Sequence, residues 1–191
     1  MPIVHEIASY TIIAMWAVWV AYWVMCMFGN KRTAYRQPWS QRLAFLVIGM
    51  SGFVAMQFVQ DPFAQFLHVK LAMDVVGTAL CAMGLGWSVW ARVVLGTNWS
   101  GIVTLKENHE LIQRGPYGIT RHPIYTGLIV AIFGTVMVTA PSPIGVITLV
   151  MIAGAFVVKL KQEEGLMLRH FPEAYPAYKA RVKAAIVPWV W

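Results

Sequence analysis

The chain is poor in charge. Only 12% of its 191 residues are Asp, Glu, Lys or Arg, whereas soluble domains carry about 25%. This scarcity argues against a soluble globular protein, because long stretches of the chain have no charged side chain to face water. Cysteine is also scarce. Cys26 and Cys81 have no partners at metal-ligand spacing, so we interpret them as buried apolar residues and expect no metal site.

Long uncharged runs take the place of the missing charges. A helix needs about 20 apolar residues to cross a bilayer. The run 123–158 is too long for one span, and Pro141 and Pro143 near its middle indicate a tight hairpin between two helices. The sequence therefore predicts an all-α integral membrane protein with about five spanning helices. Their expected ranges are 10–29, 43–60, 71–95, 124–140 and 143–159.

Basic residues are unevenly distributed over this predicted topology. Nearly all of them lie at the end of the first, third or fifth span or in the segment after it, and Lys70 alone lies on the opposite side. The positive-inside rule then places the N-terminus outside and those three segments in the cytoplasm. This distribution accounts for the net charge of +7 without nucleic acid, and it favours membrane lipids as partners. We expect a single membrane domain, 1–191, with three spans in 1–95 and the candidate chemistry in 96–191.

Three polar residues share one helical face, starting where the last predicted span ends. Lys159, Glu163 and His170 are separated by four and seven positions, and a helix turns by about 100° per residue, which aligns them. The alternative is a solvated stripe, because Glu and Lys at four-residue spacing commonly pair on helix surfaces.

A second polar group stands at the entrance of the fourth span. Arg121, His122 and Tyr125 surround Pro123, which is suited to the first turn of a helix, where free N–H groups attract anions. His122 and Tyr125 are three residues apart and can share a pocket. The alternative is an interfacial belt of polar side chains.

The segment before this entrance carries a further candidate. We expect two short extended pieces around a turn at 107–108 within residues 101–112, followed by a turn at 115–117. An extended piece containing His109, Leu111 and Ile112 would offer backbone groups that can read an adenine edge. The alternative is a surface loop.

Two stretches of the chain carry a resemblance to a known family. They are HELIQRGPYGITRHPIY and KLKQEEGLMLRHFPEAYPAYKARV. Both resemble the isoprenylcysteine carboxyl methyltransferase family and its phospholipid methyltransferase relatives. The resemblance covers residues 98–187. It implies an S-adenosylmethionine-dependent methyltransferase with a lipophilic or lipid-linked acceptor. It also implies a cytoplasmic cofactor pocket built from residues 96–123 and the C-terminal helix.

The resemblance also implies roles for individual residues. The adenosine part of the cofactor would be held by His109, Glu110, Leu111, Ile112 and Tyr117. The remainder would be held by Arg121, His122, Pro123, Ile124, Tyr125 and Glu163, and the catalytic residues would be Lys159, Glu163 and Glu164. Glu164 is expected to help orient its helix. Protein-modifying members are expected to carry an arginine where this chain has Lys159, which keeps the charge but loses the bidentate fork.

The acceptor remains open at this point. Lys159 would position a carboxylate without any general base, whereas an amine or thiol needs a base such as His170 or Glu164. Phospholipid N-methylation and methylation of a small thiol are the alternatives among enzymes. A non-catalytic lipid-binding protein or a transporter is the alternative of another class. Transport would require polar groups at the middle of the bilayer, and Asp74 is expected near the outer end of its span.

Overall fold

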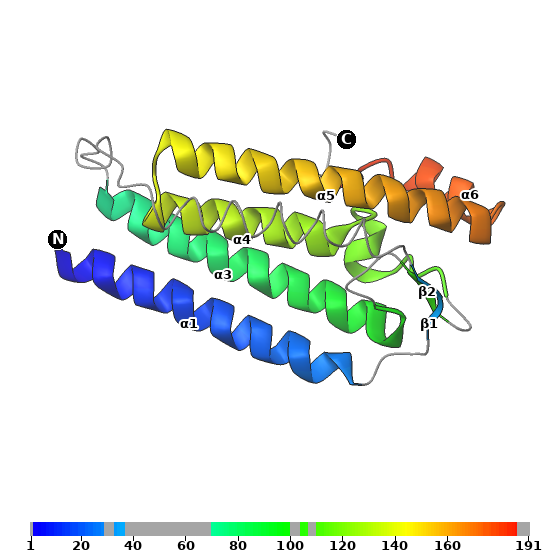
Figure 1. The fold of residues 1–191 in the computed structure, drawn as a ribbon, viewed down its shortest axis with the longest axis horizontal. Helices are drawn as coiled ribbons and strands as arrows, with labels where there is room; N and C mark the ends of the chain where they lie inside the picture. Colours follow the sequence, from blue (N-terminus) through cyan, green and yellow to red (C-terminus); the bar gives the residue numbers. More distant parts are fainter. Residues whose placement is uncertain (1, 29–32, 37–69, 100–103, 107–109, 187–191) are drawn as a thin grey trace.

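Four long helices dominate the part of the chain that the structure describes. The computed structural model describes residues 2–28, 33–36, 70–99, 104–106 and 110–186. The long helices are α1 (Pro2–Met27), α3 (Lys70–Leu95), α4 (Pro123–Thr139) and α5 (Pro143–His170), and they lie side by side along the long axis of the molecule (Figure 1). The short elements are gathered at one end of this bundle, away from the N-terminus.

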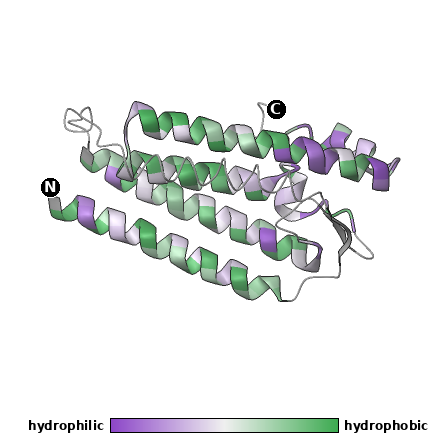
Figure 2. Ribbon diagram, in the orientation of Figure 1, coloured by the Kyte–Doolittle hydropathy of each residue, from purple (hydrophilic) through white to green (hydrophobic). Residues whose placement is uncertain are grey.

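The helices have the length and composition of membrane spans. Three helical stretches among the described residues are long and apolar enough to cross a bilayer: Ile3–Met27 in α1, Leu71–Asn98, which continues past the end of α3, and Pro143–His170 in α5. Helix α4 is a shorter apolar helix. Apolar residues extend along the bundle, and polar ones gather where α5 ends and α6 (Ala174–Arg181) begins (Figure 2). The predicted helical membrane fold is confirmed. The predicted span at 43–60 lies outside the described residues.

Close packing of α3 against α4 forms the centre of the bundle. A Cβ atom added to Gly84 would lie 2.4 Å from the carbonyl oxygen of Gly127, and one added to Gly77 would lie 2.7 Å from that of Gly134. Between these glycines, Cys81 and Ala131 are fully buried. Small residues at such positions let two membrane helices approach closely. Cys81 is buried as expected, whereas Cys26 is only partly buried.

Polar contacts attach α1 to this pair of helices. The His5 Nδ1 and Asp74 Oδ1 atoms are 3.0 Å apart near the start of both helices. Farther along, Trp19 Nε1 donates to Ser88 Oγ over 2.8 Å, and Trp16 Nε1 donates to a threonine hydroxyl of α4. Buried polar groups cost little free energy when they are paired in this way, so these bonds fix how α1 faces its neighbours.

The turn between α4 and α5 is the predicted hairpin. Ser142 caps α5 by accepting a hydrogen bond from the Gly145 N–H over 3.1 Å, and Pro143 occupies the first turn. Proline is favoured at this position because its missing N–H would have no partner there anyway. The two helices therefore reverse direction within a few residues.

A small sheet adds strands to the predicted helical fold. Strand β1 (Thr33–Arg36) pairs antiparallel with β2 (Thr104–Lys106), with Thr33 opposite Lys106 and Arg36 opposite Thr104. One extended piece expected within 101–112 is thus present, but its partner comes from the segment after α1. Residues 107–109 lie outside the described residues, and 110–113 form no regular element.

The segment after α6 runs back along the start of α4. We call residues 182–186 the strap. The Arg121 N–H donates to the Ala184 carbonyl and the His122 N–H to the Ala185 carbonyl, each over 2.9 Å. N–H groups at the start of a helix have no partner within it, so these bonds fix the entrance of α4 against the strap. The 3-10 turns η2 (Gly96–Asn98) and η3 (Gly115–Gly118) complete this end of the molecule.

Candidate functional site

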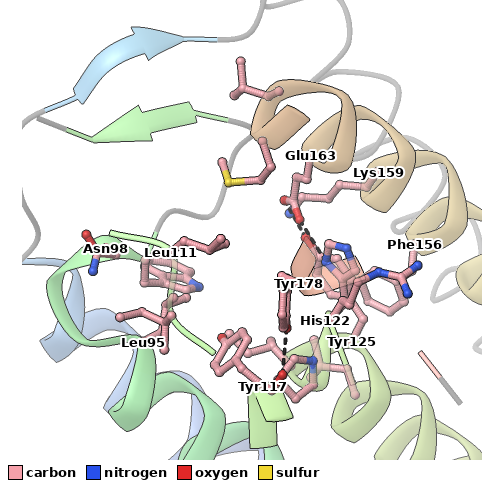
Figure 3. A pocket seen from close by; sticks show the side chains of 18 of the residues that line it. Leu95, Asn98, Leu111, Tyr117, His122, Tyr125, Phe156, Lys159, Glu163 and Tyr178 are labelled. Carbon is pink, nitrogen blue, oxygen red and sulfur yellow. Dashed lines mark hydrogen bonds and ion pairs between the residues drawn. The ribbon is translucent and has the colours of Figure 1, made fainter. Parts of the chain in front are cut away.

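A cavity of about 310 Å³ lies at the polar end of the bundle. This volume is within the range of small-molecule sites. Helices α1, α3, α4, α5 and α6 all contribute to its wall, together with the segments on either side of η3. In Figure 3, a polar group on α4 and α5 faces the residues Leu95, Asn98 and Leu111 across the cavity.

The polar group is centred on the Glu163 carboxylate. Glu163 Oε1 accepts a hydrogen bond from the Tyr125 hydroxyl over 2.7 Å, and Glu163 Oε2 lies 3.4 Å from His122 Nδ1 (Figure 3). Lys159, one turn earlier on α5, places its Nζ atom 5.4 Å from the centre of the Tyr125 ring. A carboxylate placed in this way can bind a ligand cation, and the neighbouring ammonium can attract an anionic group.

Glu164, the next residue, is not in the cavity wall and lies in a buried network that meets the polar group only at His122 Nε2, 3.6 Å from Glu164 Oε1. It accepts a hydrogen bond from Arg121 Nε on one oxygen and one from Lys179 Nζ on the other, each over 2.7 Å. Arg121 also donates to the backbone carbonyls of Val182 and Lys183 in the strap. Arg121, which is itself in the cavity wall, and Glu164 therefore join the entrance of α4, helix α5 and the strap into one unit.

Aromatic rings form a stack beside the carboxylate. The His122 and Tyr125 rings are nearly parallel, with an angle of 4° and centroids 5.5 Å apart. The Phe156 ring stacks on Tyr125 with centroids 4.9 Å apart. Flat ligand groups pack well against such surfaces.

Burial and the neighbouring charges shift the pKa values of the histidine and tyrosines in the cavity wall. Burial by itself would lower the pKa of His122, but hydrogen bonding and charge attraction from Glu163 and Glu164 outweigh it and raise that pKa. Burial raises the pKa of Tyr117 and of Tyr178. The Tyr178 hydroxyl donates to the Tyr117 carbonyl oxygen over 2.7 Å, which connects α6 to η3. The tyrosines are therefore neutral at neutral pH, and the charged form of the His122 imidazole is more favoured than it is in a free histidine.

The structure brings together most of the residues that the sequence singled out. The cavity wall includes Glu110, Leu111, Ile112, Tyr117, Arg121, His122, Pro123, Ile124, Tyr125, Lys159 and Glu163. Three candidates stand apart. Glu164 is not in the wall, His170 is exposed and stacks edge-on against Phe171, and His109 lies outside the described residues. His170 is therefore aligned with Lys159 and Glu163 in the sequence but lies beyond the cavity.

Several wall residues were not predicted. They are Trp19, Trp23, Leu95, Asn98, Trp99, Leu128, Phe156, Leu166, Met167, Tyr175 and Tyr178. Phe156 could have been found, since it is three residues before Lys159 and seven before Glu163 and so shares their helical face. The tryptophans of α1 carry no such signal, because any apolar span can place an aromatic residue at its end.

The chain is similar to known proteins in both sequence and fold. Residues 75–169 match the sequence model of the Isoprenylcysteine carboxyl methyltransferase (ICMT) family. The fold is similar to a solved structure described as the eukaryotic intramembrane Ras methyltransferase ICMT. The TM-score is 0.55 at 19% identity, covering 77% of this chain and 53% of that one.

Two curated relatives match about half of the chain. One is protein-S-isoprenylcysteine O-methyltransferase B of Arabidopsis thaliana, 29% identical over 103 residues, which are 52% of this chain and 51% of the relative. The other is the nickel-cobalt-cadmium resistance protein NccN of Alcaligenes xylosoxydans xylosoxydans, 28% identical over 110 residues, which are 57% of this chain and 50% of the relative. The chain thus spans about half the length of the curated relatives that it matches.

Proposed function

Because the chain belongs to the isoprenylcysteine carboxyl methyltransferase family through residues 75–169, we propose that it transfers a methyl group from S-adenosylmethionine to a lipophilic or lipid-linked acceptor. The reaction would take place in the cavity between α4, α5 and α6, at the cytoplasmic face of the membrane. Residues 96–191 would form the catalytic region of a single membrane domain.

The observation that carries this proposal is the position of Glu163. Its carboxylate is in the wall of the cavity, next to an aromatic stack and within reach of Tyr125 and His122. An amino-acid ammonium group can bind the carboxylate, and the long apolar wall can hold an adenosine. These are the two ends of the proposed cofactor.

The residues present fit that cofactor chemically. His122 Nε2 is buried and has no hydrogen-bond partner, and Glu164 Oε1 lies 3.6 Å from it. Because Nε2 faces Glu164, a ligand would meet the imidazole at Nδ1, which lies 3.4 Å from Glu163 Oε2 and, among the described residues, has no short hydrogen bond to give up. When bound, the cofactor supplies an electrophilic methyl group on a sulfonium. The chain itself would orient both reactants and exclude water, and well-oriented placement is worth roughly 7–11 kcal/mol.

Lys159 is the candidate for positioning the acceptor. Its ammonium lies beside Tyr125 in the cavity wall and would attract a carboxylate, so that carboxyl methylation of an isoprenylcysteine is the favoured reaction. A carboxylate needs no general base, and no His or Glu would then have to take a proton. Phospholipid amines and small thiols are the competing acceptors.

Binding is the first test. Full-length protein in detergent is titrated with S-adenosylmethionine and with its demethylated product in a calorimeter, and circular dichroism checks that the sample is helical. We expect saturable binding of both ligands. A helical sample that binds neither would overturn the proposal in favour of a non-catalytic membrane protein.

Methyl transfer is the second test. The protein is incubated with cofactor carrying a labelled methyl group and, separately, with an isoprenylcysteine analogue, a total phospholipid extract and a small thiol. We expect label in the isoprenylcysteine analogue, and its loss in a Lys159→Ala variant that still binds the cofactor. If the labelled methyl group appears only in the phospholipid or only in the thiol, the proposed acceptor would be wrong, but the proposed methyltransferase activity would stand.

A further inference from the structure

The His122 imidazole lies between the carboxylates of two consecutive residues. Its Nδ1 atom is 3.4 Å from Glu163 Oε2, and its Nε2 atom is 3.6 Å from Glu164 Oε1. Only 11% of the side chain is exposed. The Tyr125 ring covers one face of the imidazole, and the bond from the His122 N–H to Ala185 fixes its backbone. The ring therefore keeps both nitrogen atoms directed at carboxylates.

This two-sided arrangement selects the charged form of the ring. A neutral imidazole has one N–H and one lone pair, so that one carboxylate would face a lone pair. An imidazolium has two N–H groups and suits both carboxylates. The rise in the pKa of His122, which Glu163 and Glu164 produce against the effect of burial, agrees with this reasoning.

The two carboxylates differ in their other partners. Glu164 is already paired with Arg121 and Lys179 at 2.7 Å. Glu163 has the neutral Tyr125 hydroxyl on one oxygen, and its positively charged neighbours are His122 and Lys159. The tyrosines that face the cavity from η3 and α6 stay neutral because their pKa values are raised: Tyr117, Tyr175 and Tyr178.

A ligand ammonium that binds Glu163 would compete directly with the imidazolium. The ligand would add a positive charge to a cluster in which two glutamates are already surrounded by four cations: Arg121, His122, Lys159 and Lys179. His122 is the cation among them that loses a proton most readily near neutral pH. Loss of the Nδ1 proton would leave a lone pair that accepts an N–H of the ligand, while the Nε2 N–H would remain directed at Glu164.

We propose that His122 is the internal counter-cation of Glu163 and that binding of the cofactor ammonium releases the His122 proton to solvent. This inference rests on the proposed function, because the cofactor is the expected ligand. His122 then acts as a positioning residue, which holds Glu163 in place until the ligand takes over.

Calorimetry in two buffers tests the proposal. Full-length protein is titrated with S-adenosylmethionine in phosphate and in Tris at about pH 7, where the α-amino group of the ligand is still largely charged. Because Tris takes up protons with a much larger enthalpy change than phosphate, the difference in heat gives the number of protons released. We expect the release of up to about one proton per ligand. Below neutral pH, the association constant should then increase by up to about tenfold for each unit by which the pH is raised.

Two variants complete the experiment. His122→Gln has no proton to release, so any binding that it retains should give the same heat in both buffers. His170→Gln replaces an exposed histidine near the same end of α5 and should behave like the unmodified protein. Equal heats in the two buffers for the unmodified protein, or undiminished release in His122→Gln, would overturn the inference while leaving the proposed function intact. The absence of any binding heat would instead count against the proposed function.

Discussion

At the residue scale, neighbouring glutamates of α5 have different environments. Glu163 is in the cavity wall beside His122 and Tyr125, whereas Glu164 lies behind the wall between Arg121 and Lys179. Consecutive residues on a helix point about 100° apart, so one of them can face a ligand while the other joins the framework. The orienting role expected for Glu164 stays a prediction, and its surroundings suit that role better than direct catalysis.

Replacing Glu163 should weaken cofactor binding. In Glu163→Gln the ligand ammonium loses a charged partner, and a hydrogen bond to a charged group is worth about 1.5–3 kcal/mol. We expect the dissociation constant of S-adenosylmethionine to increase roughly 10- to 100-fold, measured by calorimetry. Glu6→Gln, an exposed position on α1, is the control. Equal affinities in the two variants would remove Glu163 from the site.

Replacing Glu164 should lower stability. Glu164→Ala leaves the buried Arg121 guanidinium without its carboxylate, a kind of change that costs about 3–5 kcal/mol. Lys179 is half exposed, so Lys179→Ala should cost no more than about 1 kcal/mol. Thermal unfolding in detergent, followed by circular dichroism, should therefore show a much larger fall in midpoint for Glu164→Ala. Similar midpoints in the two variants would show that the network contributes little to the fold.

At the element scale, local sequence predicts the helices well and their partners poorly. The ranges expected for α3, α4 and the hairpin agree with the structure within a residue or so. Helix α1 begins at Pro2, well before residue 10, where the predicted span begins. Its polar first turns include His5, which contacts Asp74 of α3. The pairing of β1 with β2 could not be predicted, since it depends on two segments that are distant in the sequence.

The glycine contacts between α3 and α4 give a prediction at this scale. A Cβ on Gly84 would meet Gly127 and Ala131 backbone atoms at 2.4 and 2.5 Å, whereas one on Gly86 would meet nothing within 4 Å. Gly84→Ala should therefore destabilise the bundle by about 1–3 kcal/mol, and Gly86→Ala should leave it unchanged or slightly more stable. Unfolding midpoints of the two variants provide the measurement. An unchanged midpoint in Gly84→Ala would mean that the helices are farther apart in the membrane.

At the scale of the whole molecule, only part of the candidate site could be predicted from the sequence. Arg121, His122 and Tyr125 occur together at one helix start, and Lys159 and Glu163 share a helical face, so each half could be recognised. Their convergence was implied by the family resemblance rather than by spacing. The walls from α1 and α6 depend on how helices pack around the cavity, which local patterns do not encode.

The proposed orientation can be tested on the intact membrane. Cys26 and Cys81 are first replaced by alanine, and a single cysteine is then introduced at exposed Thr139, by the hairpin, or at exposed Ala174 on α6. The turn between α4 and α5 and helix α6 lie at opposite ends of the bundle (Figure 1). A membrane-impermeant maleimide should label Thr139→Cys on whole cells and Ala174→Cys only after lysis. The reverse pattern would place the cavity on the outer face.

The strap has a consequence for how the protein is made. The Thr126 side chain donates to the Ile186 carbonyl, an acceptor 60 residues farther along the chain, and Arg121 and His122 likewise bond to Ala184 and Ala185. Translation delivers α4 to the bilayer long before the ribosome has released these acceptors. A nascent chain interrupted within α6 would therefore carry inserted helices but an unfinished pocket, and ligand capture should begin only once the last of these residues has emerged.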